Sequence, residues 1–99
     1  MVVGVVRLTL FLPENDSLKG KRKVVRQIIE RTRSRFSVAV AETAHQDAHR
    51  QAEIGLAAVG NDRRLINSVL DRVVGFIESV GTAVVADREM EILNLGHGE

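Results

Sequence analysis

Basic side chains are concentrated in one short stretch of this 99-residue chain. Residues 17–35 contain one acid, Glu30, and eight of the fourteen Lys and Arg residues: Lys19, Lys21, Arg22, Lys23, Arg26, Arg31, Arg33 and Arg35. The other residues carry six basic and twelve acidic side chains, so the net charge of +1 conceals a basic segment on an acidic body. Such a charge distribution favours binding to a polyanion. RNA, DNA and an acidic protein surface are all compatible with it.

Helical spacing would place much of this charge in one stripe. Apolar residues from Leu18 to Phe36 recur with the period of an amphipathic helix, and any such helix needs a solvated polar face. Two features go beyond that need. Like charges lie four residues apart, and each such pair lowers helix stability by about 0.2–0.5 kcal/mol. Cations also gather near the helix N-terminus, where the helix dipole favours acidic side chains. Phosphate binding would turn this repulsion into counterion release. The predicted RNA-binding residues are Lys19, Lys21, Arg22, Lys23 and Arg26, extended by Arg63 and Arg64 at the start of the second helix.

A second group of residues could hold a metal. His45 and His49, with Asp47 between them and Glu53 nearby, are donor types that bind divalent ions. Their spacing is helical, whereas the segment is typical of a loop between strands, so surface polarity is the simpler interpretation. The chain has no Cys and no Gly-rich phosphate loop, nucleophile elbow or paired-carboxylate motif. We therefore predict no catalytic residues, no metal and no cofactor, and hence no enzyme.

Length and composition predict a single domain over residues 1–95, with a frayed tail at residues 96–99. The lack of Cys favours a reducing cytoplasm. The apolar stretch at residues 1–12 is too short to cross a bilayer and lacks the basic start of a signal peptide, so we expect no membrane association.

The patterns of residue types predict the elements that position these side chains. Strands are expected over residues 2–12, 37–43, 51–60 and 82–95, with helices over 18–36 and between Asn61-Asp62 and Gly81. The order β-α-β-β-α-β with right-handed crossovers is that of an α+β, ferredoxin-like sandwich, a four-stranded antiparallel sheet (order 4-1-3-2) with both helices on one face. In the last strand, Val84, Ala86, Met90 and Ile92 should face inward, and Arg88 in that row predicts a bulge or a strand that passes the core edge. The predicted core is Val6, Leu8, Leu10, Val25, Ile29, Val38, Val40, Ile54, Leu56, Val69, Val73 and Ile77.

The uncovered sheet face should not read RNA as an RRM domain does. That mode needs aromatic rings on the first and third strands, where this chain offers one, Phe11, and an acid, Glu53. Small residues would make the face flat: Ala39, Ala41, Gly55 and Ala57. This surface, or a strand edge, predicts a homodimer or higher homo-oligomer.

Three stretches resemble the YlxP-like family of short bacterial proteins. They are Leu12-Pro13-Glu14-Asn15 leading into Ser17-Leu18-Lys19 and Lys21-Arg22, then Ala41-Glu42 with Gln46-Asp47, and finally Gly55 with Asn61-Asp62-Arg63-Arg64. The resemblance implies a ferredoxin-like fold and an unknown function, with genes among those for transcription and translation factors, hence the description ribosome-binding-factor-like. The chain departs from the family at Ala48-His49, where a bulky apolar or aromatic residue is expected.

Together these observations predict a non-catalytic RNA- or ribosome-associated protein. The alternative is a homo-oligomeric module that docks on an acidic protein of the transcription or translation machinery.

Overall fold

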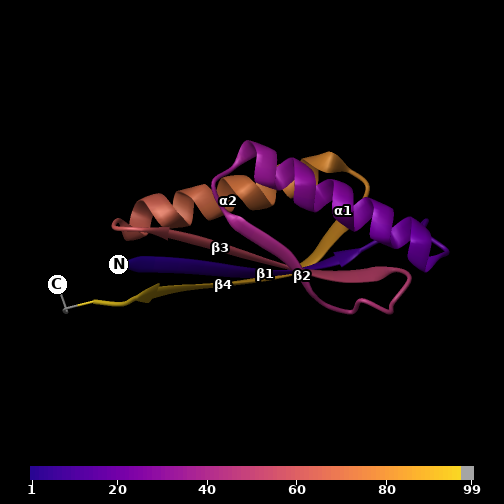
Figure 1. Cartoon of the computed structure of the whole chain (residues 1–99), viewed down its shortest axis with the longest axis horizontal. Coiled ribbons are helices and arrows are strands. Elements are labelled where there is room, and N and C mark those ends of the chain that lie inside the picture. Colours follow the sequence, from indigo (N-terminus) through magenta and orange to yellow (C-terminus); the bar gives the residue numbers. More distant parts are fainter. Residues whose placement is uncertain (97–99) are drawn as a thin grey trace.

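The predicted ferredoxin-like arrangement is confirmed. A computed structural model describes residues 1–96, so the tail predicted to be frayed lies outside the described residues except for Gly96. The four strands form one antiparallel sheet in the order β2-β3-β1-β4, and both helices cover one face of it (Figure 1). The elements are β1 (Val2–Phe11), α1 (Leu18–Arg35), β2 (Ala39–Ala44), β3 (Gln51–Gly60), α2 (Arg63–Val80) and β4 (Val84–Asn94).

Local side chains set the ends of both helices. The hydroxyl of Ser17 accepts a hydrogen bond from the Gly20 amide at the start of α1, and the carboxylate of Asp62 accepts from the amides of Arg64 and Leu65 at the start of α2. Gly81 ends α2 in the left-handed conformation, with a φ of 79°, which suits a residue without a Cβ. Both helix starts and the end of α2 therefore lie where the sequence predicted, and α1 ends at Arg35, one residue before the predicted end.

The core lies between the sheet and the helices. Alternate residues of β1 and β3 face the helices and are fully buried, among them Leu8, Leu10 and Ile54. Of the predicted core, Ile29, Val38 and Val69 are only partly buried against it, and the other nine residues are buried. The helices also bury residues outside that prediction, notably Ile28, Leu70 and Val74, because a helix lying flat on a sheet covers a broad arc of its surface.

Gly4 allows α2 to approach β1 closely. A Cβ at this position would lie 2.5 Å from Ile66 Cγ2 and 2.6 Å from Leu70 Cδ1, both on α2. These distances are shorter than any normal carbon–carbon contact, so Ile66 and Leu70, or the helix that carries them, would have to shift to admit even one methyl group. The absence of a side chain at residue 4 is thus a packing requirement.

The first half of β4 contains a bulge, and the side chains that face the core there differ from the predicted ones. The register with β1 shifts between Thr9 and Leu10, which leaves Ala86 as the extra residue. As a result Val85, and not Val84, packs against the core, while Val84 is exposed beside Phe11. Arg88 does stand on the helix side, where its guanidinium lies 2.5 Å from Oδ1 of Asp71 on α2.

We expect Gly4→Ala to lower the free energy of unfolding by about 1–3 kcal/mol, because it overpacks the α2–β1 contact. The control is Gly75→Ala on the exposed face of α2, where a Cβ meets nothing within 4 Å. That change should raise stability by about 0.5–1 kcal/mol through helix propensity. Urea unfolding of the two variants measures both effects, and equal shifts would contradict the packing argument.

Candidate nucleic-acid interface

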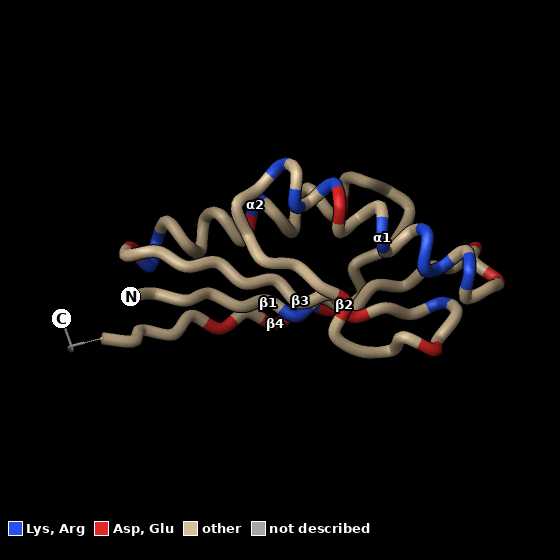
Figure 2. Tube along the Cα trace, in the orientation of Figure 1, with Lys and Arg blue, Asp and Glu red and all other residues tan. Residues whose placement is uncertain are grey.

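Four cations on the first half of α1 form the best-defined charged surface of the chain, and we call them the basic stripe: Lys19, Arg22, Lys23 and Arg26. All four side chains are exposed. Figure 2 shows the Lys and Arg positions that recur along α1. Within residues 1–96, none of them has an ion-pair partner or a side-chain hydrogen bond. The first turn of α1 contains no acid, so the unfavourable placement of cations near the helix N-terminus persists in the folded chain. The stripe is therefore available to an external anion.

The cations at the other end of α1 are partly engaged within the protein. Arg33 donates from Nη2 to the carbonyl of Val40 on β2 at 2.9 Å. Arg35 lies over the ring of Phe76 on α2, 5.0 Å from its centroid, in cation–π geometry. Both side chains thus help to hold α1 against its neighbours, and the uncommitted charge is concentrated nearer the N-terminus.

Lys21 does not belong to the interface, and its predicted contact with phosphate is wrong. Its side chain is 0% exposed, whereas those of Arg22 and Lys23, which follow it in the sequence, are exposed. Its Nζ lies 2.7 Å from Oε2 of Glu42 on β2 and donates to the carbonyl of His45 at 2.6 Å. A buried ammonium needs such partners, because desolvation without them is very costly. Lys21 is thus a structural residue that joins α1 to the β2–β3 hairpin.

The sequence did contain the signal for this burial. Lys21 precedes Val25, Ile28 and Thr32 by four, seven and eleven residues, which places it in the apolar arc of α1, and all three are buried. Glu42 likewise continues the inward alternation of Val40 on β2. An inward base and an inward acid on facing elements predict a buried pair.

A second set of contacts joins the β1–α1 loop to the same hairpin. Asn15 donates from Nδ2 to the backbone carbonyls of Ser17 at 2.7 Å and His49 at 2.5 Å. The backbone carbonyl of Asn15 accepts a hydrogen bond from Nε of Arg50 at 3.0 Å. The Leu12 amide also donates to the Arg50 carbonyl at 2.8 Å. Three motif residues around the first helix, Leu12, Asn15 and Lys21, therefore tie this part of the chain to the hairpin.

Arg63 and Arg64 cannot extend the basic stripe, and that prediction is also wrong. Val2 pairs with Gly60 and Phe11 pairs with Gln51, so α2 starts at the end of the sheet opposite the start of α1 (Figure 2). The molecule is 50 Å long in that direction. In addition, Arg63 donates from Nη1 to the carbonyl of Ile92 on β4 at 3.3 Å. Crossover topology places the two helix N-termini at opposite ends of the sheet, so the cations at the start of α2 lie far from those at the start of α1.

The hairpin histidines form no recognisable metal site within residues 1–96, where no group of three His, Cys, Asp or Glu side chains is placed to hold an ion. His45 adopts a left-handed φ of 63°, which turns the chain and presents its carbonyl to Lys21. The backbone of the hairpin thus has a structural role, and its side chains lie at the surface.

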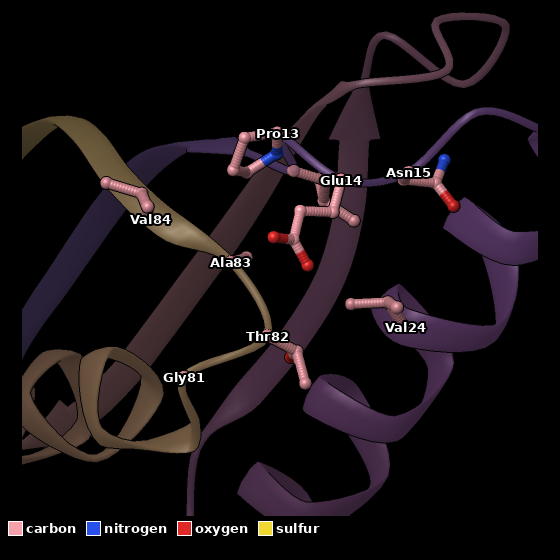
Figure 3. A pocket seen from close by; sticks show the side chains of 9 residues that line it. Pro13, Glu14, Asn15, Val24, Gly81, Thr82, Ala83 and Val84 are labelled. Atoms are coloured by element: carbon pink, nitrogen blue, oxygen red, sulfur yellow. The ribbon is translucent and has the colours of Figure 1, made fainter.

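One pocket, of about 530 Å³, lies between the β1–α1 loop, α1 and the segment that leads into β4. Figure 3 shows the carboxylate of Glu14 in it, with Val24 of α1 and Thr82 of the segment before β4 both below that carboxylate in this view. Its lining provides one carboxylate, one side-chain amide and one hydroxyl, from Glu14, Asn15 and Thr82, among mainly apolar and backbone groups. No base, nucleophile and oxyanion donor converge there, so the geometry offers no reaction mechanism.

The uncovered sheet face has the side chains that the strand alternation predicted. Arg7 at its centre forms ion pairs with Glu89 on β4 and Glu53 on β3, the latter at 3.8 Å between Nε and Oε1. Phe11 is the only aromatic residue on β1 and β3, and it lies at one end of the face. Base stacking of the RRM kind therefore has no platform here.

Fold and surface together define an α+β domain of the ferredoxin-like class with a cationic helix face. The chain belongs to the family described as "Protein of unknown function (DUF503)", whose model matches residues 3–90. It is 32% identical over 78 residues to "Uncharacterized protein YlxP" of Bacillus subtilis (strain 168), a match that covers 79% of this chain and 85% of that protein. The YlxP-like resemblance is thereby confirmed.

A solved structure shares the fold. The de novo designed protein Foldit4 aligns with a TM-score of 0.52 at 15% identity, over 97% of this chain and 100% of that one. At this identity the likeness concerns architecture alone. Neither helix of the described chain is both long and apolar enough to cross a membrane.

We expect Lys21→Met to lower the free energy of unfolding by about 3–5 kcal/mol, because it leaves the Glu42 carboxylate without its cation. Lys23→Met, on the exposed side of the same helix, should change stability by no more than about 0.5 kcal/mol. Replacing Glu42 with Met as well should recover most of the loss, since an apolar pair can substitute for a buried ion pair. Urea unfolding tests the series, and equal stability of the two single variants would contradict the buried pair.

Proposed function

We propose that this protein is a non-catalytic, RNA- or ribosome-associated protein of the cytoplasm that binds phosphate groups through the basic stripe of α1. The observation that carries the proposal is a set of four exposed cations without partners in the described chain, on a helix end where they destabilise the fold. Phosphate groups would relieve that repulsion and release counterions. The resemblance to proteins whose genes lie among translation factors makes ribosomal RNA the preferred partner.

The spacing of the stripe suits a backbone contact better than base recognition. Lys19, Arg22 and Arg26 follow one side of the helix over about 10 Å, given a rise of 1.5 Å per residue. Lys and Arg at such spacing position a protein on a nucleic-acid backbone without reading its sequence. We therefore expect binding to structured RNA with little sequence preference.

A second candidate, a module that docks on an acidic protein, rests on the same cations, because carboxylates can replace phosphates as their partners. Purification separates the two: an RNA-binding protein carries nucleic acid that high salt or nuclease removes, and a protein-docking module does not.

Self-association remains a prediction, and both free edges of the sheet oppose its strand-edge form. Arg33 covers the Val40 carbonyl on β2 and Arg63 covers the Ile92 carbonyl on β4. Each of these strands also carries a register shift. Covered carbonyls and bulges are common protection against edge-to-edge pairing, so a homo-oligomer would have to form through a surface other than these edges.

We expect the double variant Arg22→Glu/Arg26→Glu to lose most of its co-sedimentation with ribosomal subunits and to weaken binding evenly across RNA sequences. Both side chains face solvent, so its unfolding transition should match that of the wild type. With four phosphate contacts, the log–log slope of affinity against salt should be roughly −3 to −4 for the wild type and about half that for the variant.

The matched control is Arg63→Glu/Arg64→Glu, which changes the net charge equally at the opposite end of the sheet. This variant should pellet with subunits nearly as well as the wild type. Equal losses in both double variants would show that only net charge matters. If the wild type fails to pellet at low salt, the RNA proposal is refuted.

A further inference from the structure

The sheet face opposite the helices carries an exposed apolar patch at one end. Met1 and Leu95 exchange backbone hydrogen bonds, and Val3 pairs with Leu93 on β4 and Val59 on β3. Strand alternation directs these side chains away from the core. Val59 and Leu95 are each 65% exposed, Met1 is 54% exposed and Leu93 is 49% exposed. A cluster of this kind on a small domain marks a surface that another molecule covers.

Acidic side chains continue the same face beyond this patch, beginning with Glu91, the residue on β4 two positions before Leu93. Along the same face lie Glu53 on β3 and Asp87, Glu89 and Glu91 on β4, against one base, Arg7. Arg7 already pairs with Glu89 and Glu53, whereas Asp87 and Glu91 have no ion-pair partner within residues 1–96. The open face, as we call the apolar patch with these four acids, is therefore apolar at one end and negatively charged beside it.

The charge of the open face decides among its possible occupants. RNA would be repelled, and a second copy stacked directly on it would bring two acidic surfaces together. An added strand is opposed by the covered edges of β2 and β4 described above. A partner with apolar residues flanked by Lys and Arg matches both parts of the surface, because its apolar residues cover the apolar patch and its cations meet the acids.

We propose that the open face binds a basic amphipathic segment of another protein, whose apolar side chains cover Met1, Val3, Val59, Leu93 and Leu95 and whose cations contact Asp87 and Glu91. This site is independent of the RNA-binding proposal and lies on the other side of the molecule. The two faces have opposite charge, so one molecule can contact a polyanion on its helix side and a basic protein on its sheet side.

The probe is a fluorescein-labelled amphipathic helical peptide made of Leu and Lys, with a Leu/Glu peptide of the same pattern as its control. Fluorescence anisotropy with the full chain should show binding of the Leu/Lys peptide only. Asp87→Lys/Glu91→Lys and, separately, Val59→Ser/Leu93→Ser should each weaken it roughly tenfold or more, since rim charges and apolar anchors both contribute. All four residues are exposed, so thermal unfolding should confirm intact folds.

Matched controls separate this site from general charge effects and from the RNA proposal. Glu14→Lys/Glu78→Lys makes the same change in net charge at exposed acids outside the open face, and it should alter peptide affinity by no more than about twofold. Arg22→Glu/Arg26→Glu should retain peptide binding, and the open-face variants should retain RNA binding, so either proposal can fail alone.

Two results would overturn the inference. The first is a peptide result that does not depend on the open face: either no binding by the wild type, or equal weakening by Glu14→Lys/Glu78→Lys and Asp87→Lys/Glu91→Lys. The second is sedimentation of the wild type as a dimer that Val59→Ser/Leu93→Ser dissociates, which would assign the open face to a second copy of the chain.

Discussion

The buried ion pair between Lys21 and Glu42 sets the orientation on which the rest of the surface depends. Nζ of Lys21 has two oxygen partners, at 2.7 Å on Glu42 and 2.6 Å on the carbonyl of His45. These partners offset the desolvation of the ammonium group only if α1 is turned so that residue 21 faces the sheet. In this orientation the basic stripe faces solvent, and the β2–β3 hairpin lies against α1. The pair thus fixes the position of the β2–β3 hairpin relative to α1 and the side of α1 that presents the basic stripe.

Charge is divided between the two sides of the molecule by the alternation of strand and helix faces. The helix layer presents cations that repel one another, and the uncovered side of the sheet presents acids around one arginine, next to exposed apolar side chains. A net charge of +1 hides this division. Repulsion between like charges lowers the stability of the isolated chain. Such repulsion therefore persists where function requires it. The proposed RNA contact and the proposed basic protein contact would each neutralise one side.

Motif residues shared with the family have structural roles in this chain. Asn15 and Ser17 fix the β1–α1 loop and the start of α1, and Lys21 and Glu42 form the buried pair. Gly55 has a similar reason: a Cβ there would lie 2.8 Å from Cγ2 of Thr43, at the register shift of β2. These contacts explain the motifs as the means by which the hairpin, the loop and α1 are joined. Lys19 and Arg22 of the same motifs are exposed and make no such contact within residues 1–96, and they form part of the basic stripe to which the proposed function is assigned.

The sequence alone determined the element order, the sheet order, the helix caps and most of the core, because hydrophobic period and capping chemistry are local properties. It also contained the burial of Lys21, in its spacing from Val25, Ile28 and Thr32, although a count of charges placed that residue on the surface. Only the tertiary structure decided what depends on contacts between distant segments. The partner of Lys21, the bulge at Ala86 that turns Val85 inward, and the separation of Arg63 and Arg64 from the basic stripe all follow from strand pairing and crossover topology. Local patterns indicate a bulge near Arg88 and an inward Glu42, but the residue that bulges and the carboxylate that meets Lys21 are fixed by the register of strands far apart in the chain.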